Sequence, residues 1–278
     1  MIKKDSPIKL ALIYGFLIIW TIGTLYPVVR VITISLRPAD KLLSSSLAII
    51  PEGASLKNYI TLFKSTPFLR WMLNSLVVTA VVTLTGVVLA SMAGYAISKF
   101  RFPGKKTTLQ TLLTTQMFPA TMLLLPMYIM LAKLGLINSY IGLMIAYSAT
   151  ALPFCIWQMK GYYDTIPGEL IESARVDGCG NWGAWWRVIL PLAAPALVIT
   201  ALFSFMASWN EYIVAAVILQ DPSMYTLPVG LKMFQGNMST QWGLYAAGSF
   251  VVSVPVVILF IVLSRWLVSG LTLGSVKG

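Results

Sequence analysis

Residues 169–191 read ELIESARVDGCGNWGAWWRVILP, a polar and tryptophan-rich segment that lies between two long hydrophobic segments. Pro167 suits the first turn of a helix, and Gly178 followed by Gly180 suits the turn after its end. A second short amphipathic stretch, 181–187, leads back into the hydrophobic sequence, and its three tryptophans suit the level of the lipid headgroups. The segment predicts a rigid helix-turn-helix that lies beneath a membrane and is open to a partner.

The first helix of this segment is predicted over Pro167 to Asp177 and has two different faces. Helical periodicity places Leu170, Ile171 and Ala174 on one face. It places Glu169, Glu172 and Val176 on the other face. One face is therefore expected to pack and the other to stay polar.

The composition indicates that the rest of the chain lies in a bilayer. Of its 278 residues, 58% are hydrophobic and only 10% are charged, and the mean hydropathy is +0.81. Soluble domains are about half apolar and a quarter charged. This composition excludes an ordinary soluble domain.

Six stretches are free of charge and long enough to supply the ~20 residues of a membrane-spanning helix. The predicted fold is an all-α integral membrane protein with a single transmembrane domain over 1–278. Its six transmembrane helices are expected at approximately 10–31, 72–98, 108–131, 138–160, 190–218 and 243–267, with a connecting loop at 161–189.

The distribution of lysine and arginine predicts the orientation of these helices. With the N-terminus inside, twelve basic residues fall on the cytoplasmic side: Lys3, Lys4, Lys9, Lys99, Arg101, Lys105, Lys106, Lys160, Arg175, Arg187, Arg265 and Lys277. Eight fall outside: Arg30, Arg37, Lys41, Lys57, Lys64, Arg70, Lys133 and Lys232. Both termini and loop 161–189 are therefore expected in the cytoplasm.

The first hydrophobic stretch could instead be a cleaved signal peptide, because it follows three lysines. Its apolar part is longer than the ~7 to 15 residues of a signal core, and no small-x-small cleavage site follows Val29. An uncleaved first helix is the favoured interpretation.

Several function classes are disfavoured by what the chain lacks. The net charge of +11 is what orientation and anionic headgroups require, so nucleic-acid binding is not expected. Two cysteines, Cys155 and Cys179, give no metal-ligand spacing, and there is no histidine. Gly104-Lys105 has Lys99 where a phosphate-binding loop needs its first glycine. No catalytic residues, cofactor or metal are expected in this chain.

Small residues and prolines mark positions inside the spans. Gly86, Ala90 and Gly94 recur every four residues, which favours close packing within the chain over the alternative of a subunit contact. Prolines are expected to interrupt the third, fourth and sixth spans, at Pro119, Pro126, Pro153 and Pro255.

The most distinct group of polar residues within a predicted span consists of Trp209, Asn210, Glu211 and Tyr212. Glu211 either faces a polar interior or another subunit, or the helix ends early and Glu211 lies at the outer headgroups. Aromatic faces and hydrogen-bonding groups are what a polyhydroxylated ligand needs.

The loop resembles the cytoplasmic signature of the permease subunits of ATP-binding-cassette (ABC) importers, Glu-Ala-Ala, three residues, Gly, nine residues, Ile-x-Leu-Pro. Glu172, Ala174, Gly178, Leu190 and Pro191 match this pattern, with Ser173 and Val188 as small departures. In that family the loop forms a coupling helix seated in a cleft of the ATPase subunit. The resemblance therefore implies a type I importer permease fold, with Glu169, Glu172, Ser173, Ala174, Asp177 and Gly178 as the ATPase-coupling residues.

Further strings extend the resemblance over nearly the whole chain and narrow it to the MalG-like carbohydrate branch. They are Asn58-Tyr59, Asn74-Ser75, Trp209-Asn210-Glu211, 226–231 (TLPVGL) and 270–278 (GLTLGSVKG). The resemblance implies that Trp209, Asn210, Glu211 and Tyr212 lie near a sugar path or its outer gate.

The resemblance also implies an assembly in a bacterial or archaeal cytoplasmic membrane. Its members would be this chain, a second homologous permease, two ATPase subunits and an extracellular solute-binding protein, with a sugar or oligosaccharide as substrate. ATP and Mg would be bound by the ATPase subunits alone, so this chain would not be an enzyme.

Three alternatives remain at this stage. A permease of the same class could carry glycerol phosphate, an amino acid or phosphate. An ion-coupled secondary transporter would want several ionisable residues within the spans, and this chain offers only Glu211. A membrane-embedded enzyme would need paired carboxylates, a metal cluster or an assembled nucleophile and base.

Overall fold

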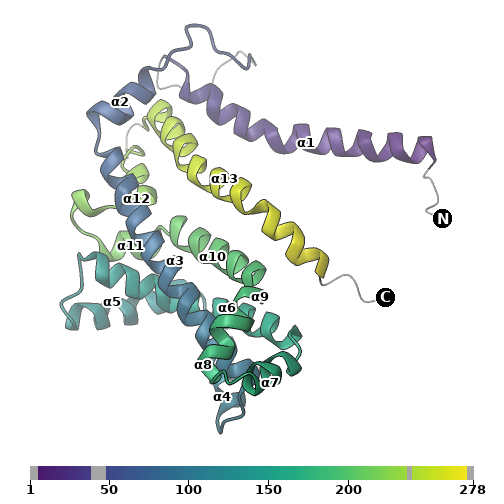
Figure 1. The fold of residues 1–278 in the computed structure, drawn as a ribbon. Helices are drawn as coiled ribbons and strands as arrows, with labels where there is room; N and C mark the ends of the chain where they lie inside the picture. The colour runs from purple at the N-terminus through teal and green to yellow at the C-terminus, as the bar shows by residue number, and fades with distance from the viewer. Residues whose placement is uncertain (1–5, 39–47, 237–239, 274–278) are drawn as a thin grey trace. The chain divides into compact units, whose positions relative to one another are not determined.

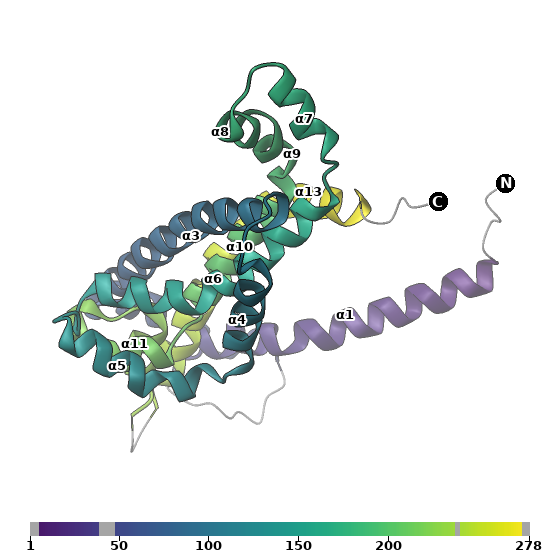
Figure 2. The ribbon, with the colours of Figure 1, turned by 90° about the horizontal axis from the view of Figure 1, so that it is seen from below.

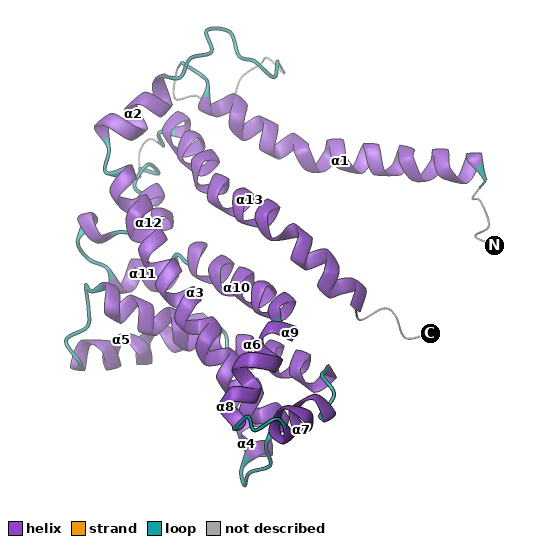
Figure 3. Cartoon of the chain, viewed as in Figure 1, coloured by secondary structure: helices purple, strands orange, loops and turns teal. Residues whose placement is uncertain are grey.

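The computed structural model describes residues 6–38, 48–236 and 240–273. Within these residues the chain is helical, and Figures 1 and 3 draw no strand. The predicted inside residues Lys3, Lys4 and Lys277, the predicted outside residue Lys41 and the end of the terminal string, 274–278, lie outside the described residues.

Four long helices are apolar enough to cross a membrane, and they overlap four of the predicted spans. They are α1 (Pro7–Ser35), α3 (Phe68–Lys99), α6 (Tyr140–Thr165) and α13 (Trp242–Leu273, apolar over 242–264). The shorter helices are α2 (Lys57–Ser65), α4 (Lys105–Met117), η1 (Ala120–Leu123), α5 (Leu124–Lys133), α7 (Glu169–Val176), α8 (Asn181–Ala184), η2 (Trp185–Ile189), α9 (Leu190–Leu192), α10 (Ala194–Trp209), α11 (Ile213–Ile218), η3 (Pro222–Met224) and α12 (Leu227–Lys232).

The other two predicted spans are bent pairs of helices. The segments 105–117 and 120–133 meet at 98°, and the segments 181–192 and 194–209 meet at 78°. The described residues therefore contain four candidate spans, or six if each bent pair is one span.

Only one of the four prolines expected to interrupt a span separates two helices. Phe118 has extended backbone angles (φ −80°, ψ 129°) because the ring of Pro119 disfavours a helical conformation in the residue before it. Pro126 lies in the first turn of α5, and Pro153 and Pro255 lie inside helices that continue past them. Pro153 and Pro255 therefore each remove one backbone hydrogen bond within a helix that continues.

The chain divides into two compact units, 1–69 with 231–254 and 70–230 with 255–278. In the first unit, Asn58 Nδ2 donates to the backbone carbonyls of Ser35 (2.9 Å) and Arg37 (3.0 Å). A Cβ on Gly243 would collide with the Asn58 side chain, so a glycine is required there. The Asn58-Tyr59 string thus fixes the end of α1.

In the second unit, the small residues of α3 pack against helices of the same chain, as the favoured interpretation predicted. A Cβ on Gly94 would come within 2.9 Å of Lys160 N and Met159 Cβ on α6. A Cβ on Gly86 would lie 3.3 Å from Ser204 Oγ on α10, and Ala90 is fully buried. These small residues allow α3 to lie close to both helices.

Candidate functional site

Helix α7 has one buried and one exposed face. Ile171 (6% exposed) and Ala174 (5%) pack into the chain's own core with Tyr163 and Trp185. Four residues at i, i+3, i+4 and i+7 face outward: Glu169, Glu172, Ser173 and Val176. Leu170 is 40% exposed, which corrects its expected position on the packed face.

Gly178 ends α7 in a left-handed conformation (φ +82°). The Cys179 N–H donates to Ala174 O (2.9 Å) and the Gly178 N–H donates to Arg175 O (3.0 Å). This pair of bonds is a Schellman motif, which satisfies the last carbonyls of the helix. A Cβ on Gly178 would meet no atom within 4 Å, so space does not require a glycine there. The left-handed backbone angle does require one.

The chain then turns back through α8 and the π-helical turn η2. Arg175 Nη2 donates to Asn181 Oδ1 (2.8 Å), which joins α7 to α8. Trp185 is buried (7% exposed), whereas Trp182 and Trp186 are 66% and 64% exposed. Figure 2 shows α7, α8 and α9 gathered into one group at the end of α6.

This group is attached to the carboxyl end of α3. Lys99 Nζ donates to the carbonyl of Ile166 (2.6 Å), which lies three residues before α7. One side of Asp164 accepts from Ser98 Oγ (2.6 Å), and the other pairs with Lys160 Nζ (2.6 Å). We call these five residues, Ser98, Lys99, Lys160, Asp164 and Ile166, the latch.

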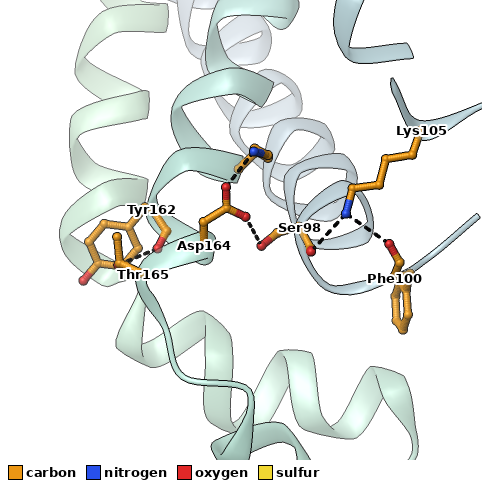
Figure 4. A network of polar contacts seen from close by, with 7 residues as sticks. Ser98, Phe100, Lys105, Tyr162, Asp164 and Thr165 are labelled. Atoms are coloured by element: carbon orange, nitrogen blue, oxygen red, sulfur yellow. Dashed lines mark hydrogen bonds and ion pairs between the residues drawn. The ribbon is translucent and has the colours of Figure 1, made fainter. Parts of the chain in front are cut away.

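Figure 4 shows Asp164 of the latch beside Ser98, and the second carboxylate oxygen of Asp164 pairs with Lys160. Lys105 approaches from the next helix, and its Nζ donates to the carbonyls of Ser98 (3.3 Å) and Phe100 (3.2 Å). Because a lysine is favourable at exposed carbonyls of a helix end, Lys105 stabilises the carboxyl end of α3.

The amino end of α3 is held differently, by neutral donors that reach about 150 residues along the chain. Trp71 Nε1 donates to Pro222 O (2.9 Å), and Asn74 Nδ2 donates to Ser223 O (3.1 Å) and Tyr225 O (2.9 Å). The Leu227 N–H donates to Ser75 Oγ (2.7 Å). We call Trp71, Asn74, Ser75 and segment 222–227 the clasp; it unites two of the strings noted in the sequence.

The four residues predicted for the path do not form one surface. Trp209 is 1% exposed and stacks on Phe205 at 5.4 Å, where α10 ends. Asn210 is exposed and its Nδ2 donates to Met206 O (3.0 Å). Tyr212 is 38% exposed.

Glu211 caps a helix. Its carboxylate accepts the Val214 N–H (3.0 and 3.1 Å) and the Ala215 N–H (3.1 Å) at the start of α11. Of the two interpretations of Glu211, the structure therefore agrees with an early end of the helix, at Trp209. A carboxylate among free N–H groups is stabilised there, which explains an acidic residue in a hydrophobic segment.

Sequence reasoning missed the latch and the clasp. Lys99 and Asp164 were visible as charges near helix ends, but nothing in the sequence pairs positions that far apart. Among the described residues, no group of three or more histidine, cysteine or acidic side chains is placed to hold a metal ion.

The fold and this polar loop define an integral membrane protein of the permease class. Residues 86–272 match the family described as "Binding-protein-dependent transport system inner membrane component". The chain therefore belongs to this family of transport subunits, which are not enzymes.

Several relatives align with nearly the whole chain. The maltodextrin transport system permease protein MdxG of Bacillus subtilis is 34% identical over 267 residues, covering 95% of each chain. The maltose/maltodextrin permease protein MalG of Escherichia coli K12 is 33% identical over 294 residues, covering 99% of this chain and 98% of MalG. The galactooligosaccharides permease protein GanQ of Bacillus subtilis is 33% identical over 280 residues, with coverage of 99% and 98%.

A solved structure shares the fold. A chain of a bacterial ABC transporter involved in the import of the acidic polysaccharide alginate superposes with a TM-score of 0.81 over 96% of this chain and 99% of that one. The sequences are 23% identical, so this likeness concerns the fold alone.

Proposed function

We propose that this protein is a permease subunit of an ABC importer and forms half of the membrane path for a sugar or oligosaccharide. The relatives MdxG, MalG and GanQ are named for the transport of maltodextrin, maltose and galactooligosaccharides, and they align over nearly their full length. The other half would come from a second homologous permease. A solute-binding protein would deliver the sugar, as suggested by the alginate transporter solved with a periplasmic protein.

The geometry of α7 carries the proposal for coupling. Its outward stripe combines three polar residues with Val176, which is 88% exposed although it is apolar. A short helix that presents both kinds of group, next to the sharp turn at Gly178, suits a cleft in an ATPase subunit. Glu169, Glu172, Ser173 and Asp177 would contact that cleft, while Ala174 supports the helix from its buried side.

The latch supports the transmission of movement from α7 into the membrane. A displacement of α7 would be transmitted to α6 through the short connection between the two helices. It would be transmitted to α3 through the hydrogen bond from Lys99 to Ile166. A rigid helix can therefore convert closure of two ATPase subunits into a shift of packed helices. ATP and Mg would be bound by those subunits, and loop 161–189 and both termini would lie in the cytoplasm.

The test is ATPase activity of the full assembly in vesicles, with its binding protein and a panel of oligosaccharides. One sugar should stimulate hydrolysis, and Glu172→Lys should reduce that stimulation by at least about tenfold, because it reverses a charge in the contact. Glu52→Lys is the matched control, since Glu52 is exposed outside α7.

The outcomes separate the two parts of the proposal. If a phosphate compound or an amino acid stimulates hydrolysis and no sugar does, the sugar assignment is wrong. If Glu172→Lys behaves like Glu52→Lys, α7 is not the coupling contact.

A further inference from the structure

Helix α4 is unusual among the membrane segments because it is polar at nine of its thirteen positions, KKTTLQTLLTTQM. None of its residues is buried. It belongs to a bent pair of helices that together are long and apolar enough for a membrane segment, so its polar side chains fall within a candidate membrane segment. Polar groups at that depth need protein or water beside them.

The polar residues of α4 form a stripe on one face. Thr107, Gln110, Thr111 and Thr114 follow the spacing i, i+3, i+4 and i+7, and all four are exposed. The opposite face carries Leu109 and Leu112, which are half-buried, and Gln116, whose Nε2 donates to Thr150 O of α6 (3.3 Å). The stripe therefore points away from α6.

Contact with lipid tails would be energetically unfavourable for this polar stripe. Thr114 lowers its own cost because its hydroxyl donates to Gln110 O (2.9 Å). The Gln110 side chain cannot satisfy its hydrogen bonds in the same way, since its amide has two donors and an acceptor to satisfy. Hydroxyl and amide groups at this spacing suit a ligand that carries many hydroxyl groups.

Two cavities lie where α4 ends against α6. They have volumes of about 340 and 280 Å³, and both are lined by Gln116 and Thr150. The first also contains Ala149, whose carbonyl lacks its helical donor because residue 153 is a proline. The second is lined by Phe154 and Phe203, whose rings meet edge to face at 5.3 Å. Polar acceptors and aromatic faces thus lie next to each other, as sugar recognition requires.

We infer that the polar stripe of α4 lines this chain's half of the sugar path. Gln116 lies on the opposite, α6-facing side of the helix, at its carboxyl end, where it and Thr150 of α6 line the two cavities. The inference rests on the proposed function and assigns the path to α4 instead of Trp209–Tyr212. Neither cavity is lined by any of those four residues. The break at Phe118–Pro119 ends α4 beside these cavities.

The test uses single cysteines in the complete transporter. Gln110→Cys and Thr114→Cys are made in a parent that carries Cys155→Ala and Cys179→Ser, because Cys155 lines the second cavity. Leu113→Cys is the matched control, because Leu113 lies on the same helix, is 47% exposed and is off the stripe. Labelling by a charged, membrane-impermeant thiol reagent is measured with and without the sugar that stimulates ATPase activity.

We expect the stripe cysteines to react at least about tenfold faster than Leu113→Cys, and the sugar to slow them, because the stripe is wetted and the control meets lipid. Equal rates at all three positions would show that the stripe is no more accessible to water than the control position, which would overturn the inference. Stripe cysteines that resist the reagent but cross-link to the second permease would show a subunit interface, which also overturns it.

A second measurement separates this inference from the proposed function. If no sugar stimulates the parent transporter, the proposed function fails. If a sugar stimulates it but protects neither stripe cysteine, only the assignment of the path fails. Gln110→Leu should raise the sugar concentration needed for half-maximal transport by about tenfold with unchanged protein abundance.

Discussion

The two ends of helix α3 are held by different chemistry. At its amino end, the clasp uses neutral groups: Trp71 and Asn74 donate to backbone carbonyls and Ser75 accepts a backbone N–H, and Trp71 and Ser75 are each 2% exposed. At its carboxyl end, the latch uses charged side chains, and those of Lys160 and Asp164 are 20% and 41% exposed. The first end resembles a core and the second resembles a surface.

This difference has an energetic consequence. A buried hydrogen-bonding group that loses its partner costs about 1–3 kcal/mol, whereas an exposed ion pair is worth about 0–1 kcal/mol. The clasp is therefore suited to fixing the fold. The latch is suited to changing its partners during transport, and it lies next to the helix that we propose as the coupling contact.

The sharpest way to break the clasp is Gly230→Ala. A Cβ on Gly230 would overlap the indole of Trp71, and neither the ring nor the helix can move without breaking the Trp71 bond to Pro222. We expect a loss of about 3 kcal/mol or more, because overpacking of a rigid site cannot relax. The measurement is thermal unfolding of the purified protein. Gly161→Ala should show no such loss, since a Cβ there meets no atom within 4 Å.

A milder break of the clasp is Asn74→Ala. It leaves the carbonyls of Ser223 and Tyr225 without their donor, so we expect a loss of about 2 kcal/mol. Asn210→Ala is the matched control, because Asn210 is exposed and bonds only within its own turn of α10. Equal melting temperatures for the two variants would contradict a structural clasp.

The loop that follows the latch is tested by Gly178→Ala. An alanine in the left-handed conformation costs about 1–2 kcal/mol, and this cost falls on the turn between α7 and α8. Gly180→Ala should be nearly neutral, because Gly180 has φ −67° and ψ 174°, which any residue adopts. We expect sugar-stimulated ATPase activity to fall in the first variant only. Similar activity in both would show that the turn geometry is not needed for coupling.

The sequence predicted α7 well because its signals are local. Pro167, the alternation of buried and exposed positions and Gly178 all lie within one short segment, and the observed helix, Glu169–Val176, falls inside the predicted one. Long helices such as α3 and α6 were equally visible, since freedom from charge over about 20 residues is a strong signal.

The sequence could not reveal contacts between distant positions. Glu211 illustrates this limit, because its carboxylate suggested a polar path when read as a residue within a span. Its partners are the N–H groups of Val214 and Ala215, which exist as free donors only because α10 ends at Trp209. The sequence therefore suggested a polar path where the structure shows a helix cap, although the polarity of α4, on which we base our own proposal for the path, was equally present in the sequence.

The smallest effect on stability is expected from Asp164→Asn in the latch. An asparagine can still accept from Ser98, but it loses the ion pair with Lys160, so unfolding should change by less than about 1 kcal/mol. Transport should respond more strongly, because the bond that joins Asp164 of α6 to Ser98 of α3 would lose its charged acceptor. We expect basal ATPase activity to rise relative to sugar-stimulated activity. Lys99→Met should give the same shift, since it removes the other half of the latch. If both variants keep the native ratio while remaining folded, the latch is a static part of the fold like the clasp, and the contrast between the two ends of α3 has no role in coupling.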